Sequence, residues 1–313
     1  MILVTGGSGY LGSHIVRKLV GAGKQVRVMV YNPRRSQTER RLRDLNVDWI
    51  EGDVTRPETL PPALEDVEAV VHTVAIAIEK GGRTYEAINY EGTVHMVDAA
   101  LKAGVGRFIN ISQLGAAPDL PYRFLASKGQ AQDYVARSSL NWTAFRPSVI
   151  WGPEDEFANT FARLVPITPI IFPLIGDEKS KFQPVWVDDV AASVLASLES
   201  DWTFQKEYEL GGPEILTLEE IERRTLNALG ARRTLVRFPT SLLKVIVTLM
   251  EKVFPAPPVT RSLLELLEVE NVTKENAIMR FVPDPKPFTA ENTRVYMETF
   301  KVSDTIAQFM GRF

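Results

Sequence analysis

The sequence predicts an α/β protein in which a doubly wound parallel sheet is followed by a smaller C-terminal lobe. Three observations predict this fold: a glycine-rich turn follows the first apolar strand, short apolar strands alternate with helical patterns over residues 1–150, and prolines interrupt this rhythm afterwards. Alternating strands and helices imply parallel pairing through right-handed crossovers. Ligands bind such sheets at the carboxyl ends of the strands, so the residues that follow each strand are the first candidates for a site.

The first twelve residues form the most informative motif. Residues 2–4 indicate a strand, and Gly6, Gly9 and Gly12 follow in a turn that opens a helix ending near Gly21 and Gly23. Gly6 allows the tight turn, Gly9 lets the backbone approach a ligand, and Gly12 lets the helix pack against the strand. The helix would present its free N–H groups and positive dipole end to an anion. The motif predicts Rossmann-type binding of a dinucleotide pyrophosphate, with a purely structural strand–turn–helix as the alternative.

Apolar periodicity predicts the elements that follow. The predicted strands are Val26–Val30, Val47–Glu51, Glu68–His72 and Arg107–Ile111. The predicted helices are Tyr90–Ala103, Val187–Leu198 and Leu218–Leu229, the last opened by a capping box of Thr217 and Glu220. The domain prediction is a dinucleotide-binding domain over residues 1–150, with 183–212 returning to it. Residues 151–313 are predicted to form a mixed lobe and a C-terminal helical extension.

Composition excludes several classes of function. A formal net charge of −3 gives no argument for nucleic acid, and the absence of cysteine excludes disulfides, thiolate metal sites and cysteine nucleophiles. The three histidines have no metal-ligand spacing, so no metal is expected. The glycine motif begins at the initiator methionine and no apolar run could span a bilayer, so we expect a cytoplasmic protein without a leader, at most peripheral to a membrane.

Several motifs, in order along the chain, carry a family resemblance. They are Thr5–Gly12, Gly52–Val54, His72–Ala75, Asn89–Thr93, Ile111–Gly115, Ser127-Lys128 and Arg146–Pro153. In this order and spacing the chain resembles the extended and atypical short-chain dehydrogenase/reductase superfamily, which includes the NAD-dependent epimerases and dehydratases. Within it the chain is most similar to the nucleotide-binding accessory subunits of respiratory complex I and their bacterial relatives. Four stretches carry that likeness: Asn141–Ser148, Gln183–Val190, Tyr208–Pro213 and Pro257–Leu264.

The resemblance implies a set of cofactor-binding residues. They are Gly6, Gly9, Tyr10, Leu11, Gly12, Tyr31, Arg34, Arg35, Asp53, Val54, Thr73, Val74, Ala75, Asn89, Lys128, Pro147 and Val149. Asp53 would meet the adenine amino group, although it could instead cap the turn before Thr55. Asn89 could simply be a helix N-cap.

The end of the second predicted strand bears on the choice of cofactor. An acid there would accept hydrogen bonds from the adenosine ribose and favour NAD, but the sequence continues with Tyr31 and offers no acid. Arg34 and Arg35 could instead bind a 2′-phosphate through bidentate hydrogen bonds. NADP(H) is therefore favoured over NAD(H), and a solvated arginine loop is the alternative.

The family's catalytic pattern is incomplete in this chain. Active members carry a tyrosine four residues before a lysine, with a serine at the end of the fifth strand; here Lys128 and Ser112 are present but Phe124 replaces the tyrosine. Phenylalanine has no hydroxyl to ionise, and such a general acid/base is worth roughly 10²–10⁴ in rate. Tyr122 could substitute only if the helix begins after it. A glutamate usual in the family is replaced by Gln132.

Three functions follow from these residues. In the first, the nucleotide is mainly a structural ligand or a redox sensor of a protein similar to the complex I subunit. In the second, the protein is an NADP-dependent oxidoreductase or sugar-nucleotide epimerase or dehydratase that uses Ser112 and Lys128. In the third, it is an assembly or scaffold factor for a membrane complex, and its apolar surfaces are exposed.

Two apolar segments bear on partners. Leu164–Ile175 has no charge and three prolines, so it cannot form a continuous helix or a central strand. It could be a lid over a lipophilic small molecule such as a quinone, a docking patch for a protein, or ordinary packing. Residues 239–254 form an amphipathic helix with few lysines on its polar side, which favours packing or a protein partner over anionic lipid. The tail over 282–313, predicted to contain a weakly amphipathic helix, has no assigned role.

Overall fold

The computed structural model describes residues 1–31, 41–174, 180–238, 240–254, 257, 259–297, 303, 305, 307 and 310. The chain divides into two compact units. Unit 1 comprises Met1–Pro147, Val187–Leu210 and Lys274–Asp284, and unit 2 comprises Ser148–Trp186, Gly211–Thr273 and Pro285–Phe313.

Unit 1 is built on a seven-stranded sheet in which every pairing is parallel. The strand order is β11-β6-β5-β4-β1-β2-β3, so the order reverses beside β1, where such sheets bind ligands. This architecture confirms the predicted doubly wound fold. The strands are β1 (Ile2–Thr5), β2 (Val26–Val30), β3 (Asp48–Glu51), β4 (Ala69–His72), β5 (Arg107–Ile111), β6 (Trp142–Pro147) and β11 (Lys206–Leu210).

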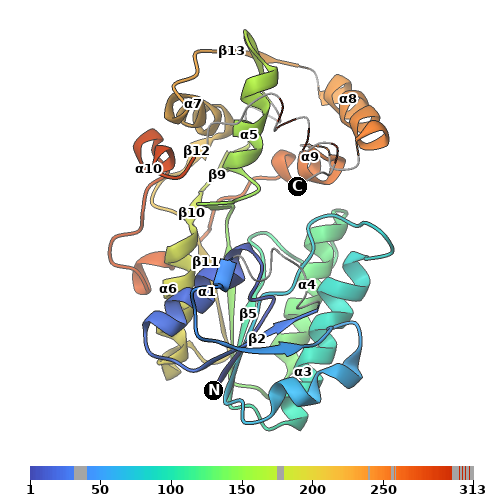
Figure 1. Ribbon diagram of the computed structural model, residues 1–313, viewed down its shortest axis with the longest axis vertical. Helices are drawn as coiled ribbons and strands as arrows, with labels where there is room; N and C mark the ends of the chain where they lie inside the picture. The colour runs from blue at the N-terminus through green and yellow to red at the C-terminus, as the bar shows by residue number, and fades with distance from the viewer. Residues whose placement is uncertain are drawn as a thin grey trace. The chain divides into compact units, whose positions relative to one another are not determined.

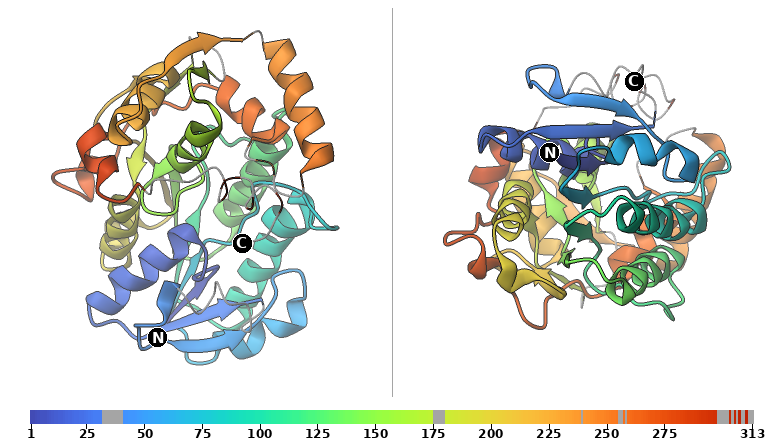
Figure 2. Two further views of the ribbon diagram at one scale, coloured as in Figure 1. Left: turned by 45° about the horizontal axis from the view of Figure 1, so that its top comes forward. Right: turned by 90° about the horizontal axis from the view of Figure 1, so that it is seen from below.

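Helices cover both faces of this sheet (Figures 1 and 2). On one face, α1 (Tyr10–Gly21) packs against α6 (Val187–Leu198). On the other lie α3 (Gly92–Lys102) and α4 (Arg123–Arg137), and residues of α3 and α4 share one apolar core with residues of β1, β4 and β5. The shorter helical turns of unit 1 are η1 (Pro57–Thr59), η2 (Pro61–Leu64), η3 (Glu86–Glu91), η5 (Asp201–Thr203) and η6 (Ile278–Arg280).

One predicted helix begins earlier than its pattern indicated. The expected helix Tyr90–Ala103 is α3 preceded by a π-helical turn, η3, whose N-cap is Tyr85. Asn89 lies inside that turn and is fully buried, so the alternative in which it is a helix N-cap is wrong. Its side chain binds the backbone of Ile76 in the loop that follows β4.

Unit 2 contains three two-stranded sheets and five helices within its described residues. The pairs are β7 (Ile150–Trp151) with β10 (Val185–Trp186), β9 (Lys181–Phe182) with β12 (Leu216–Thr217), and β8 (Ile171–Leu174) with β13 (Thr234–Arg237). The helices are α5 (Ala158–Leu164), α7 (Leu218–Ala228), α8 (Thr240–Val253), α9 (Arg261–Glu268) and α10 (Ala290–Arg294), with a short η4 turn at Val165–Ile167.

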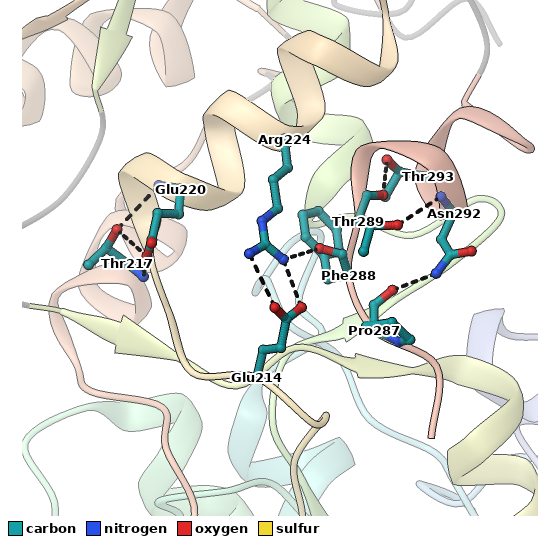
Figure 3. A network of polar contacts seen from close by, with 9 residues as sticks. All are labelled: Glu214, Thr217, Glu220, Arg224, Pro287, Phe288, Thr289, Asn292 and Thr293. Carbon is teal, nitrogen blue, oxygen red and sulfur yellow. Dashed lines mark hydrogen bonds and ion pairs between the residues drawn. The ribbon is translucent and has the colours of Figure 1, made fainter. Parts of the chain in front are cut away.

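The predicted capping box of α7 is confirmed (Figure 3). The Thr217 hydroxyl accepts from the Glu220 N–H, and the Glu220 carboxylate accepts from the Thr217 N–H. Further along α7, Arg224 donates to the Glu214 carboxylate and to the Phe288 carbonyl, which ties the helix to the segment that leads into α10. Arg224 thus links α7 to the chain on both sides of it in the sequence, at Glu214 and at Phe288.

The apolar segment Leu164–Ile175, whose last residue lies outside the described residues, has no single regular structure over 164–174. It passes from the end of α5 through η4 into β8, which pairs only with β13 among the described strands. This agrees with the expectation that its prolines prevent a continuous helix or a central strand. Ile167, Ile170 and Ile171 are exposed, whereas Leu164, Phe172 and Leu174 are buried.

Candidate functional site

The glycine turn between β1 and α1 is held by close backbone contacts. Gly6 has a φ of +72°, and a Cβ on it would lie 2.8 Å from the Thr73 hydroxyl oxygen. A Cβ on Gly12 would lie 2.2 Å from the Gly6 carbonyl oxygen, so helix and turn approach too closely for any side chain. Gly9 is the N-cap of α1 and contributes no side-chain acceptor. The first-turn N–H groups of α1 are therefore left for a ligand, and no acidic side chain competes with an anion there.

A cavity of about 390 Å³ lies at this turn within unit 1. It is lined at the carboxyl ends of β1, β2, β3 and β4, which is where the sheet's topology places a ligand. Eleven predicted cofactor residues line it together: Gly6, Gly9, Tyr10, Leu11, Gly12, Tyr31, Asp53, Val54, Thr73, Val74 and Ala75. Six further lining residues were not predicted: Ser8, Met29, Val30, Gly52, Arg83 and Ile88.

Asp53 combines the two roles considered for it. Its carboxylate accepts from the N–H and the hydroxyl of Thr55 at 2.9 and 2.8 Å, which is a turn cap. The same side chain lines the cavity and lies 3.8 Å from the Arg56 guanidinium. The turn therefore holds the carboxylate at the cavity wall, and capping does not remove it from the site.

Arg83 is the most informative lining residue that the sequence did not reveal. Its guanidinium carbon lies 4.9 Å from the centre of the Tyr31 ring, a cation–π contact at the end of β2. A tight turn places it there: Gly81 and Gly82 both have positive φ, and the Lys80 and Arg83 backbones exchange hydrogen bonds. No sequence signal linked residue 83 to residue 31, because their proximity depends on the sheet.

The remaining predicted cofactor residues lie elsewhere. Arg34 and Arg35 fall outside the described residues. Asn89, Lys128 and Pro147 belong to unit 1 but do not line the cavity, and Val149 belongs to unit 2.

Asn89 instead fastens the loop that follows β4. Its amide oxygen accepts from the Ile76 N–H at 2.8 Å, and its amide nitrogen donates to the Ile76 carbonyl and to the Ser127 hydroxyl. The π-helical turn around Asn89 aims the side chain at this loop. Asn89 is therefore a positioning residue for the wall of the cavity.

Lys128 and Ser112 lie together at the end of β5. The Lys128 ammonium donates to the Ile111 carbonyl at 2.7 Å, one residue before Ser112. Lys128 is buried, and this desolvation lowers its pKa to about 8. The Ser112 hydroxyl is buried and makes no hydrogen bond to the described residues. The fold thus places a cation of reduced pKa near an unpaired hydroxyl.

The ring of Phe124 occupies the family's tyrosine position. It packs edge-to-face against Tyr85, with the ring centres 5.8 Å apart. The Tyr85 hydroxyl donates to the Ala77 carbonyl and is therefore engaged in the loop. Tyr122 is the extended N-cap residue of α4 and is half-buried, so the helix does begin directly after it. Gln132, at the usual glutamate position, accepts from the Asn110 amide.

The three histidines make separate contacts. His14 lies 2.7 Å from the Asp188 carboxylate, His95 lies 2.8 Å from the Val54 carbonyl, and buried His72 contacts the hydroxyls of Thr5 and Thr93. Within the described part of the chain, no three His, Cys, Asp or Glu side chains are grouped so as to hold a metal ion.

Comparison with known families agrees with this geometry. Residues 6–201 match the model of a family described as NAD(P)H-binding, which covers more than half of the chain. The chain belongs to this family. It is an NAD(P)H-binding member of the atypical short-chain dehydrogenase/reductase and epimerase superfamily, as the motifs indicated.

Relatives of this NAD(P)H-binding protein include a respiratory subunit and a reductase. It is 32% identical over 268 residues to the mitochondrial NADH dehydrogenase [ubiquinone] 1 alpha subcomplex subunit 9 of Arabidopsis thaliana, which covers 81% of this chain and 65% of the relative. It is 28% identical over 239 residues to the ceramide reductase of Caulobacter vibrioides, covering 76% and 74%. The chain thus spans less than two thirds of the respiratory subunit's length.

Solved structures support the fold of this NAD(P)H-binding protein. The UDP-glucose 4-epimerase of Thermotoga maritima aligns with a TM-score of 0.71 at 20% identity, covering 96% of this chain and 98% of the epimerase. At that identity the likeness concerns the fold alone. Among the residues that the structure describes, no helix combines the length and the apolar character needed to cross a membrane.

Proposed function

We propose that this protein binds NADP(H) in the cavity of unit 1 and holds it as a structural or redox-sensing ligand. The glycine cradle at the N-terminus of α1 suits a pyrophosphate, because Cβ atoms on Gly6 and Gly12 would collide with the backbone or with Thr73. Asp53 suits the adenine amino group. When bound, the nicotinamide can carry a hydride, which allows the protein to distinguish the oxidised from the reduced state.

The observation that carries this proposal is Phe124. The family moves a substrate proton through a tyrosine hydroxyl, and here the ring at that position packs against Tyr85 and has no ionisable group. Lys128 is still present to hold the nicotinamide ribose through its ammonium group. Binding is therefore retained while the proton exchange that supports turnover is removed.

The preference for the phosphorylated cofactor rests on charge. The end of β2 offers no acid, and Tyr31 stands there with the Arg83 guanidinium over its ring. Arg83 is exposed, and no carboxylate partner for it is found among the described residues. A 2′-phosphate would form an ion pair with the Arg83 guanidinium, as the sequence-based prediction expects it to do with Arg34 and Arg35.

The first test is calorimetric titration of the nucleotide-free protein with NADPH and then NADH. We expect tight binding of NADPH, weaker binding of NADH, and no NADPH oxidation with carbonyl substrates above the uncatalysed rate. Lys128→Ala should weaken binding of both nucleotides, whereas Lys102→Ala on the far part of α3 should not. If neither nucleotide binds the wild-type protein, the proposal is wrong.

A second candidate function is that of an oxidoreductase or epimerase that uses Ser112 and Lys128. It is favoured by the buried, unpaired Ser112 hydroxyl and by the Lys128 pKa of about 8, because perturbed groups of this kind gather at catalytic sites. Tyr122, which precedes α4, offers a replacement hydroxyl. A lipophilic or nucleotide-sugar substrate is the expectation from the sequence.

The two candidates respond differently to one substitution. If only the family hydroxyl is missing, Phe124→Tyr should create reductase activity about 10²-fold above the wild-type background. If Tyr122 already supplies the hydroxyl that exchanges a proton with the substrate, the wild type should be active and Tyr122→Phe should abolish that activity. If the wild type and Phe124→Tyr both bind NADPH but neither has reductase activity, the structural or sensory role would be favoured.

A further inference from the structure

Helix α8 is apolar over a wider arc than its unit buries. At about 100° per residue, the apolar side chains of the helix cover more than half of its circumference, more than the stripe a surface helix needs to cover a core. Leu243 and Val247 are buried, and α8 packs against α9. Figure 1 shows α8 beside α9 at the margin of unit 2. Met250 is half-buried, and the rest of the apolar arc faces solvent.

The exposed part of that arc is a continuous stripe. Its members fall within an arc of about 100° and run the length of the helix. They are Leu242, Val245, Ile246, Leu249 and Val253, with exposed fractions of 45, 57, 41, 57 and 67%. Burying such a stripe would be favourable, so its exposure marks a surface that contacts something apolar.

The charges beside this stripe indicate what that partner is. Lys252 is exposed and follows Val245 around the helix, at the edge of the stripe. Glu251 is the one acidic residue of the helix, and its carboxylate accepts from the N–H and the guanidinium of Arg261 at 2.9 and 2.7 Å. The acid is thus neutralised by α9, and Lys252 is the one charged residue of α8 at an edge of the stripe.

A second surface of unit 2 has the same character. Ile170 and Ile171 are exposed at 73 and 47%. Thr234 donates its N–H to the Ile170 carbonyl and Arg233 donates to the Thr168 carbonyl, so the exposed isoleucines lie beside an Arg232-Arg233 pair. Apolar side chains bordered by cations on two separate elements complement a surface that is apolar inside and anionic outside.

We propose that unit 2 docks on a lipid bilayer with anionic headgroups, with α8 lying in the plane of the interface. The stripe of α8 would enter the boundary between headgroups and acyl chains, and Lys252 would extend its ammonium group to the phosphates. Each cation near such a surface adds attraction that salt screens. The sequence alone favoured packing or a protein partner because lysines are few, and the exposed stripe and the arginine pair are what change that assessment.

The test is co-sedimentation of the full chain with vesicles of phosphatidylcholine alone and of equal parts phosphatidylcholine and phosphatidylglycerol. We expect binding to the anionic vesicles, weaker binding to the neutral ones, and partial release by salt. Leu249→Asp should reduce binding to the anionic vesicles by at least about tenfold, because it places a charge in the centre of the stripe. The matched control is Val295→Asp, which adds the same charge at a position that is 82% exposed on another element and should bind as the wild type does.

Two results would overturn the proposal. One is equal binding of wild type and Leu249→Asp to the anionic vesicles, with circular dichroism showing that both are folded. The other is no vesicle binding by the wild type together with a concentration-dependent dimer that Leu249→Asp dissolves, which would assign the stripe to a second copy of this chain. Lys252→Gln separates the charge contribution, because it should weaken binding to anionic vesicles and leave binding to neutral vesicles unchanged.

Discussion

At the scale of single residues, Arg83 and Tyr31 bear on which nucleotide the cavity accepts. Arg83→Ala removes a guanidinium that stands over Tyr31, and a hydrogen bond between such a group and a phosphate is worth about 1.5–3 kcal/mol. We expect NADPH affinity to fall by roughly 10- to 100-fold and NADH affinity to change far less. Calorimetric titration of both nucleotides measures the ratio directly.

A control variant separates failure of the role proposed for Arg83 from failure of the nucleotide site itself. Arg137→Ala removes another surface arginine, whose side chain is 82% exposed and pairs with Asp133 on α4, and it should leave both affinities unchanged. Equal losses of NADPH and NADH affinity in Arg83→Ala would mean that Arg83 stabilises the loop and does not read the phosphate. Absence of binding in the wild type would instead reject the nucleotide site itself.

At the scale of elements, the junction of β1 and α1 depends on the absence of one carbon atom. Gly12→Ala would place a Cβ 2.2 Å from the Gly6 carbonyl oxygen and 2.8 Å from the Gly7 Cα, so the helix and turn must separate. We expect nucleotide binding to fall by at least about tenfold and the melting temperature to drop by several degrees. Gly21→Ala is the matched control on the same helix, because nothing lies within 4 Å of its Cβ.

Gly21→Ala should be neutral or stabilise the protein by up to about 1 kcal/mol, since alanine favours helix. Calorimetric titration of the two variants measures their nucleotide affinity, and thermal unfolding measures their melting temperatures. If Gly12→Ala binds NADPH as the wild type does, the turn adapts more easily than its geometry implies, and the pyrophosphate site is not where the helix begins.

The parts of the fold that local chemistry determines could be predicted from the sequence. The glycine turn and the capping box at Thr217 depend on neighbours within a few residues, and the strands β1 to β5 were recognised by their own apolar residues. Strands β6 and β11 were not predicted as strands, because β6 ends at Pro147 and β11 carries charged residues at three of its five positions.

The same distinction applies to the site. Residues that directly follow a strand were found, because the topology of a parallel sheet sends them to one edge. Arg83 and the structural use of Asn89 were missed, because each depends on a loop meeting an element far away in the chain. On α8, periodicity located the apolar arc but could not say which half of it the protein buries.

At the scale of the whole molecule, buried His72 couples the stability of the fold to pH. It contacts the hydroxyls of Thr5 on β1 and Thr93 on α3, and burial, with a smaller effect from the charge of Lys128, lowers its pKa to about 3. In the unfolded chain its pKa would be about 6.5. Between these values the unfolded chain binds the proton that the folded protein refuses.

The stability that neutral His72 allows is therefore complete above about pH 6.5 and is lost as the pH falls toward 3, by up to about 1.4 kcal/mol per pH unit. Asp155 in unit 2 acts in the opposite sense, because burial raises its pKa to about 6 and the folded protein holds a proton there that the unfolded chain releases. The pH dependence of the wild type's free energy of unfolding thus contains both contributions. The contribution of His72 is isolated only by comparing the wild type with a variant that lacks this histidine.

His72→Gln supplies that difference, because glutamine can meet both hydroxyls and does not titrate. Urea unfolding of both proteins at pH 7 and pH 5 should show that the wild type loses about 2 kcal/mol more than the variant over this interval, whatever their stabilities at pH 7. Equal losses would mean that the folded protein protonates His72 without cost. The region of polar contacts among β1, β4 and α3, on the side of the sheet that carries Lys128, would then be hydrated enough to stabilise a protonated His72.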